Sequence, residues 1–356
     1  MVAFIQTPLR LSLLLGCLVM GSVGLMGCQS SPVPQQDGSN LQAEGEVQTD
    51  RLDVTVTIPP QKYFVEKIGG DRLNVNVFVP GTSDPHTYEP KPQQLQALSE
   101  TEAYVLVGLG FEAPWLDRLK SANGEMVLID SSQGIEPLLM AAHDHSAHGH
   151  GEKEADHQEE HGHSGDHHED HNDENHDEDP QTQSSLENGD RPSTADPHIW
   201  LSPTLVKQQA TAIAASLGQL DPPNAAYYQG NLEKFLGEIE QLDQQIRQNL
   251  ASVTPRKFIV FHPSWGYFSQ DYDLEQIPIE VDGQEPSAQE LGKLIDLAKQ
   301  DNLNVIFAEP QFSPKNAAAI AAEIQGRVET IDPLAGNWSD NLLTVSQKIG
   351  QQNKGE

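Results

Sequence analysis

The chain has 356 residues, with 53 Asp and Glu against 21 Lys and Arg and a formal net charge of −32. This length is enough for two domains of ordinary size. Because phosphate backbones and anionic membranes are bound through Lys and Arg, the charge argues against nucleic acid or anionic lipid as the main partner.

The N-terminus has the layout of a secretory signal. A mainly apolar run from Leu11 to Val23 follows Arg10 and is too short to span a bilayer comfortably. The run ends in Leu-Met-Gly-Cys at residues 25–28, which resembles a bacterial lipoprotein processing site with Cys28 as the lipid-bearing residue. We therefore predict a signal peptide at residues 1–27 and lipidation of Cys28. Ordinary cleavage nearby, with release into the periplasm, is the alternative.

The cysteine count restricts the chemistry of the mature chain. The only other cysteine, Cys17, leaves with the signal, so at most one Cys remains. This excludes an internal disulfide and a thiolate metal site. Residues 28–50 are rich in Gln, Ser, Pro and Gly and are predicted to be a flexible tether, because they cannot bury a core.

Residues 51–202 are predicted to form an N-terminal α/β lobe. Apolar runs predict strands at Leu52–Ile58, Val75–Val79, Tyr104–Leu109 and Met126–Ile129. Helices are predicted between them, at Pro60–Ile68, Pro92–Glu102 and Ala113–Ala122. Strands that alternate with helices are typical of a parallel sheet covered on both faces.

Residues 203–254 are predicted to be a connecting helical region. Asp221 and Pro222 provide a cap and a first turn, and apolar side chains follow at spacings of three and four. These are Tyr228, Leu232, Phe235, Ile239, Leu242, Ile246 and Leu250. A helix over 222–251 would be about 42 Å long at 1.5 Å per residue, long enough to run along two lobes. We interpret it as a stiff connector; a packing helix of one lobe is the alternative.

Residues 255–356 repeat the strand and helix alternation as a C-terminal α/β lobe. Strands are predicted at Lys257–Phe261, Ile277–Val281, Asn304–Ala308 and Val328–Ile331. Helices are predicted at Ser287–Gln300, Ser313–Gly326 and Asp340–Gln351. The predicted fold is therefore α/β, with two lobes that each hold a roughly four-stranded parallel sheet flanked by helices, joined by a long rigid helix.

Three histidines lie at places where the predicted sheets would bind a ligand. Ligands of open α/β sheets bind beyond the carboxyl ends of the strands. His86 follows the strand Val75–Val79, His262 directly follows Lys257–Phe261, and His198 lies where the chain resumes after a low-complexity segment. For one such histidine a hydrogen-bonded or capping role is the ordinary explanation. Three imidazoles in one crevice fit zinc, at about 2.0–2.1 Å per nitrogen, with a fourth place for a carboxylate or water. Manganese and calcium prefer more oxygen ligands.

Two carboxylates also follow predicted strands and are candidates for the fourth ligand. Asp332 follows the last strand and is the preferred candidate, and Glu309 follows the third strand of the second lobe. The alternatives are that Asp332 caps a turn and that Glu309 pairs with a nearby base.

Five motifs together carry a family resemblance. They are Asp-Pro-His-Thr-Tyr-Glu-Pro from residue 84, Asp-Pro-His-Ile-Trp-Leu from 196, His-Pro-Ser-Trp-Gly-Tyr-Phe from 262, Glu-Pro-Gln from 309 and Asp-Pro-Leu-Ala from 332. Residues 51–350 resemble the metal-binding solute-binding proteins of ABC importers, a family that includes metal-binding lipoproteins and adhesins, and most of all its zinc-uptake members. The resemblance implies metal in a cleft between two lobes, with His86 and His198 as ligands from the first lobe and His262 from the second. Manganese-binding relatives commonly carry Glu at the third place, so His262 favours zinc.

The other eleven histidines crowd into residues 143–179, together with 14 acidic residues and a single base, Lys153. They are His143, His145, His148, His150, His157, His161, His163, His167, His168, His171 and His176. Zinc-binding relatives carry a charged, histidine-rich loop in this place. With almost no apolar side chains, the loop, taken as 143–190, is predicted to be disordered without metal and to bind several ions weakly. Capture and transfer of zinc, sensing and buffering are open roles, and an ordinary solvated linker is the alternative.

These observations predict an extracytoplasmic protein that binds Zn²⁺ as transported cargo and delivers it to a membrane permease with its ATPase. We expect a monomer that catalyses no reaction and touches the membrane only through a lipid anchor. The alternatives are a manganese or iron importer component, a metal buffer or adhesion protein without a permease, and a three-histidine zinc hydrolase or hydratase. The sequence has neither a His-Glu-x-x-His helix nor a Gly-x-Ser-x-Gly elbow, which disfavours the enzyme.

Overall fold

The computed structural model describes residues 51–140, 195–280, 284 and 286–352. The predicted signal peptide, the tether with Cys28, and the histidine-rich loop lie outside the described residues, so the predictions made for them stay predictions. None of the helices in the described ranges is long and apolar enough to cross a membrane.

The first lobe contains a parallel four-stranded sheet with the order β2-β1-β3-β4. Its strands are β1 (Leu52–Val56), β2 (Leu73–Val77), β3 (Ala103–Leu106) and β4 (Val127–Asp130). Helices α1 (Pro59–Gly69), α2 (Pro92–Ala97) and α3 (Leu116–Ala122) connect them. The inner strands β1 and β3 are mostly buried, as expected for a parallel sheet covered on both faces.

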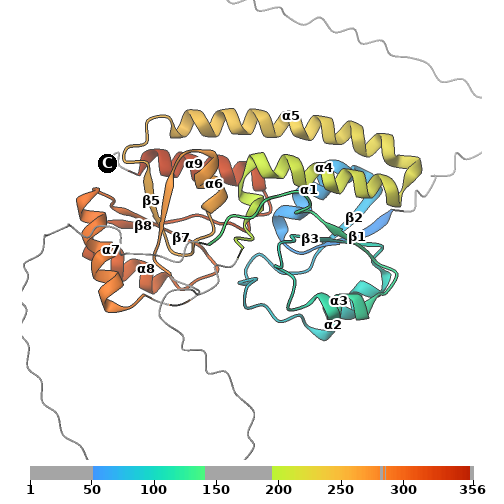
Figure 1. The fold of residues 1–356 in the computed structure, drawn as a ribbon, viewed down its shortest axis with the longest axis horizontal. Coiled ribbons are helices and arrows are strands. Elements are labelled where there is room, and N and C mark those ends of the chain that lie inside the picture. The colour runs from blue at the N-terminus through green and yellow to red at the C-terminus, as the bar shows by residue number, and fades with distance from the viewer. Residues whose placement is uncertain (1–50, 141–194, 281–283, 285, 353–356) are drawn as a thin grey trace, which may run out of the picture. The chain divides into compact units, whose positions relative to one another are not determined.

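The second lobe repeats this arrangement, with the order β6-β5-β7-β8 and all pairs parallel. Its strands are β5 (Lys257–Val260), β6 (Glu275–Pro278), β7 (Val305–Ala308) and β8 (Arg327–Thr330). Its helices are α6 (Gly266–Asp271), α7 (Ala288–Gln300), α8 (Pro314–Glu323) and α9 (Trp338–Gln351). The predicted fold class, two α/β lobes with four parallel strands each, is confirmed (Figure 1).

The structure differs from the predicted elements at several boundaries. Strands β2 and β6 each begin two residues earlier than predicted, because a polar residue, Asn74 in β2 and Gln276 in β6, interrupts the pattern just before the apolar run. Pairing also continues past the assigned end of β2, since Val79 donates its N–H to the carbonyl of Thr57 at 2.9 Å. Helix α6 was not predicted, because six residues are too few to display a helical period.

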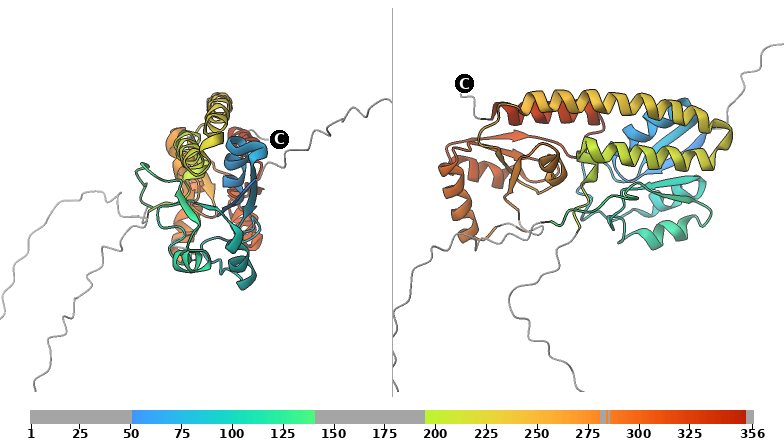
Figure 2. Two further views of the ribbon diagram at one scale, coloured as in Figure 1. Left: turned by 90° about the vertical axis from the view of Figure 1, so that its right-hand side faces the viewer. Right: turned by 45° about the horizontal axis from the view of Figure 1, so that its top comes forward.

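Two helices join the lobes. Helix α4 (Pro203–Leu220) begins at Ser202, whose side chain accepts a hydrogen bond from the N–H of Leu205 at 3.0 Å. Helix α5 (Ala225–Leu250) has 26 residues, a length of about 39 Å. It begins three residues later than predicted, since Pro222–Asn224 form a 3₁₀ turn. Helix α5 contacts α1 of the first lobe and α9 of the second, which makes it a connector of both lobes (Figures 1 and 2).

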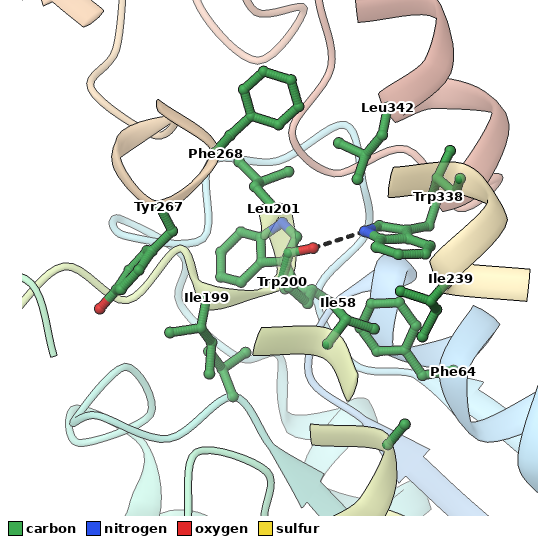
Figure 3. Packing of buried hydrophobic residues seen from close by; sticks show 14 of the residues in the cluster. Ile58, Phe64, Ile199, Trp200, Leu201, Ile239, Tyr267, Phe268, Trp338 and Leu342 are labelled. Atoms are coloured by element: carbon green, nitrogen blue, oxygen red, sulfur yellow. Dashed lines mark hydrogen bonds between the residues drawn. The ribbon is translucent and has the colours of Figure 1, made fainter. Parts of the chain in front are cut away.

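Aromatic side chains fill the junction between the lobes. Trp200 donates its Nε1–H to the carbonyl of Pro333 in the second lobe at 2.7 Å. Trp338 of α9 donates its Nε1–H to the carbonyl of Trp200, also at 2.7 Å, and packs against Phe64 of α1 (Figure 3). All three side chains are buried. Two hydrogen bonds therefore anchor Trp200, directly after His198 and Ile199, to the second lobe.

Candidate metal site

The structure brings the three sequence-predicted histidines together at the carboxyl ends of the two sheets. His86 lies on the loop after β2, His262 follows β5, and His198 precedes the 3₁₀ turn Ile199–Leu201. One ring nitrogen from each lies within 4.8 Å of the others. The Nε2 atoms of His86 and His198 are 3.3 Å apart. Two nitrogens bound to one tetrahedral zinc ion at about 2.0–2.1 Å lie about 3.3 Å from each other, so this pair already has the spacing of two ligands.

Two carboxylates orient the buried imidazoles. Asp196 accepts a hydrogen bond from Nδ1 of His198 at 2.7 Å, and Glu280 accepts one from Nδ1 of His262 at 3.1 Å. A proton on Nδ1 of a neutral imidazole leaves the Nε2 lone pair free. The Nε2 atom of His262 is buried and has no partner among the described residues. Both rings therefore present an unprotonated Nε2 to the space between the histidines, as metal ligands held by an outer carboxylate do.

The surroundings of the site favour neutral imidazoles. Burial, together with the neighbouring His198 and His262, lowers the pKa of His86 to about 3, although part of His86 is exposed at the mouth of the site. Burial also lowers the pKa of His198, against the opposing effect of Asp196. At neutral pH these two rings are ready to bind a cation without first losing a proton.

A small cavity of about 20 Å³ lies between the histidines, enough for one ion or one water molecule. Aromatic rings surround it. Phe111 packs edge-on against His86 at 5.5 Å between ring centroids, and Phe312 stacks on His262 at 5.1 Å. The small volume leaves no room for a complete hydration shell, so an entering cation must exchange most of its water for imidazole nitrogen.

The two carboxylates proposed as a fourth ligand lie elsewhere. In the described part of the chain, the group of possible ligands contains the three histidines alone. Asp332 accepts hydrogen bonds from the N–H of Leu334 and from Nε2 of Gln311, both at 2.9 Å, so it caps a turn. Glu309 is buried, and one of its oxygens accepts the backbone N–H of His262 at 3.3 Å. Burial raises the pKa of Glu309 to about 8, which makes it a neutral carboxylic acid at pH 7.

The sequence analysis did not identify three residues that surround the site. Asp196 lies two residues before a histidine, and that spacing is a signal that could have been used. Glu280 directly follows the pairing of β6 with β5, so an acidic residue at a strand end could also have drawn attention. Gln311 lines the cavity but carries no local signal, because its partners are distant in sequence.

Comparisons with known proteins identify the family of this chain. The family model of ZnuA, the periplasmic component A of zinc-uptake complexes, matches residues 54–348. The high-affinity zinc uptake system protein ZnuA of Paracoccus denitrificans is 34% identical over 273 residues, which cover 75% of this chain and 78% of that protein. A crystal structure of ZnuA and one of a zinc-bound ZnuA deletion mutant are each 53% identical, cover 86% of this chain and all of theirs, and superpose with a TM-score of 0.70. This chain therefore belongs to the ZnuA family of zinc-uptake components.

Proposed function

We propose that this protein is the zinc-binding component of an ABC importer, and that it binds Zn²⁺ through His86, His198 and His262. The observation that carries the proposal is the convergence of three imidazole nitrogens, two of them freed by carboxylates at Nδ1, around a cavity of one-ion size. The zinc ion is cargo, so the site has to capture it tightly and release it when the protein docks.

The donor set supports zinc over manganese. Three neutral nitrogens suit a borderline cation such as zinc, whereas manganese prefers a site rich in oxygen. The carboxylates near the site are either hydrogen-bonded to histidines or turned to a backbone N–H. Comparison of Mn²⁺ and Zn²⁺ affinities distinguishes this function from that of a manganese or iron importer component.

The cavity also argues against catalysis. A zinc hydrolase needs room for its substrate next to the metal and a free general base. The cavity of about 20 Å³ has no such room, and Glu280 already accepts the Nδ1–H of His262. We therefore propose that the protein catalyses no reaction.

The partners and the location follow from this function. We propose that the protein works outside the cytoplasmic membrane, as a monomer, with a membrane permease and its ATPase. Lipidation of Cys28 would keep it near the permease. The eleven histidines of residues 143–179 would hold further zinc weakly, because each ion must order a long polar segment to collect its ligands. They would also raise the zinc concentration near the cleft.

Zinc titration of three proteins tests the proposal. The mature protein without residues 143–180 should retain one tight site. Replacing His262 by Ala in that protein should weaken zinc binding by orders of magnitude, and His86→Ala should do the same. Unchanged affinity in both variants would remove the cleft as the site, and loss of tight binding on deletion of the loop would move the function to the loop. Tighter binding of Mn²⁺ than of Zn²⁺ would favour the other importer class.

A further inference from the structure

Gln311 bridges the two lobes at the cavity. It lies three residues after β7 and lines the space between the histidines. Its Nε2 donates to the carbonyl of Gly81 at 2.7 Å and to Oδ1 of Asp332 at 2.9 Å. Gly81 belongs to the first-lobe loop that carries His86, and Asp332 follows the last strand of the second lobe. One amide group thus ties both lobes together beside the candidate metal site.

The hydrogen bonds determine which way the amide points. A backbone carbonyl and a carboxylate only accept, so the NH₂ end of Gln311 must face Gly81 and Asp332. The carbonyl oxygen Oε1 then lies at the other end of the amide. This oxygen is buried and has no partner among the described residues, although the side chain lines the cavity. A buried amide oxygen without a partner is unfavourable, so a donor is expected there.

The same contacts keep Asp332 away from the histidines. Oδ1 of Asp332 accepts from Gln311 and also from the N–H of Leu334 at 2.9 Å. Its neighbours Pro333 and Leu334 line the cavity, whereas Asp332 does not.

We propose that Gln311 determines the fourth coordination position of the site. It holds the carboxylate of Asp332 off the metal and accepts, through Oε1, a hydrogen bond from a water molecule that completes the coordination. The inference rests on the zinc site proposed above. Its consequence is selectivity: three imidazoles and a water form a neutral ligand set that suits zinc, whereas an added carboxylate oxygen improves the site for Mn²⁺.

Cobalt(II) provides the readout, because its visible spectrum responds to the number and type of ligands. In the loop-deleted protein, Gln311→Leu removes both ends of the amide and should free Asp332 to coordinate. The Co²⁺ spectrum should change, and the ratio of Zn²⁺ to Mn²⁺ affinity should fall by about 10–100-fold, the range seen for outer-shell changes. Gln311→Asn keeps an amide but is one methylene too short to bridge, and should have the same effect if Gln311→Leu does not fold.

A second substitution separates release of Asp332 from general damage. In Gln311→Leu combined with Asp332→Asn, no carboxylate can replace the water, so the Co²⁺ spectrum should return towards that of the unsubstituted protein. Asp332→Asn alone should keep the original spectrum. The inference is overturned if Gln311→Leu and Gln311→Asn leave both spectrum and selectivity unchanged, or if Asp332→Asn alone alters the spectrum. Neither result would count against the proposed zinc site. That proposal fails separately, if the loop-deleted protein shows no tight zinc site that His262→Ala removes.

Discussion

Asp196 binds His198 twice through one oxygen, Oδ1, which accepts the ring Nδ1–H at 2.7 Å and the backbone N–H at 2.9 Å. Both residues are buried. The carboxylate therefore fixes the ring relative to its own backbone and selects the tautomer with a free Nε2. In the first motif of the same type, Asp84 accepts the backbone N–H of His86 at 2.9 Å and the hydroxyl of Thr87. The two Asp-Pro-His motifs thus look alike in sequence but hold their histidines differently.

This difference predicts unequal effects of two matched substitutions. Asp196→Ala should weaken zinc binding by about 10–100-fold, because the ring of His198 loses its orienting partner. Asp84→Ala should weaken it less, since it removes a bond to the backbone of His86. Competition titrations of both variants against a zinc chelator measure the two effects. Equal losses would mean that the carboxylate acts on the loop rather than on the ring.

The pH dependence of zinc binding follows from the lowered pKa values of His86 and His198. Free imidazole, with a pKa of about 6.5, takes up protons in competition with zinc below about pH 7. In the cleft His86 and His198 should take up protons only at lower pH, so from about pH 7.5 to 6 the loop-deleted protein should lose less zinc affinity than three free imidazoles would. A chelator competition series over this range tests it. An affinity loss as steep as that of three free imidazoles would contradict the pKa shifts of His86 and His198.

The same shifts predict how the stability of the zinc-free protein depends on pH. The unfolded chain binds protons at His86 and His198 below about pH 6.5, while the folded protein does not until the pH approaches the lowered values. Their contribution to stability is therefore complete above about pH 6.5 and is lost as the pH falls. Saturating zinc should shift the loss to lower pH. Urea unfolding with and without zinc measures both effects, and identical curves would contradict the linkage.

The pKa of Glu112 predicts the opposite pH dependence, a stability that falls as the pH rises. Glu112 is buried in the loop between β3 and α3, where its carboxyl accepts hydrogen bonds from the hydroxyl of Thr57 and from the N–H of Val107, both at 2.6 Å. Burial outweighs these bonds and raises the pKa of Glu112 to about 7. The folded state then holds a proton that the unfolded state loses above about pH 4.5, so this contribution to stability falls as the pH rises through 7.

Glu112→Gln should therefore flatten the fall in unfolding free energy between about pH 5 and 8. The amide stays neutral over this range and can still accept from the two donors. Urea unfolding at several pH values gives the comparison, with the exposed Glu100→Gln as a control that should follow the unsubstituted protein. Parallel curves for Glu112→Gln and the unsubstituted protein would show that the carboxyl does not titrate in this range.

Removal of the hydrogen bond donated by Trp338 should show how much the lobe junction contributes to stability. Trp338→Phe keeps an aromatic ring but removes the Nε1–H that binds the carbonyl of Trp200. A buried carbonyl left without its donor should cost about 1–3 kcal/mol of unfolding free energy. Trp115→Phe is a matched control inside one lobe, since Trp115 donates its Nε1–H to the carbonyl of Tyr88 at 3.0 Å where the group is only partly buried. The control should cost less; an equal cost would remove the special role of the junction.

The sequence alone was sufficient for the fold class and for selecting three histidines that the structure brings together. Parallel strands buried on both faces are continuous apolar runs, and the seven apolar residues of α5 repeat with the helical period; both patterns are local. His86 and His262 could each be placed at the carboxyl edge of its own sheet because both follow strands, and ligands of open α/β sheets bind beyond that edge. Edge-strand boundaries and the six-residue α6 were missed because their patterns are too short or too polar.

Only the tertiary structure decided what surrounds the three rings. The bond from Glu280 to His262 spans 18 residues, and the bond from Gln311 to Gly81 spans 230 and joins two lobes. No periodicity or motif encodes such pairs, because they depend on how the two lobes close on each other. Asp332 is the clearest example of a residue whose contacts could not be predicted from the sequence. Its position after a strand made it a candidate ligand, yet its Oδ1 accepts hydrogen bonds from Gln311 and Leu334, and it does not join the group of the three histidines.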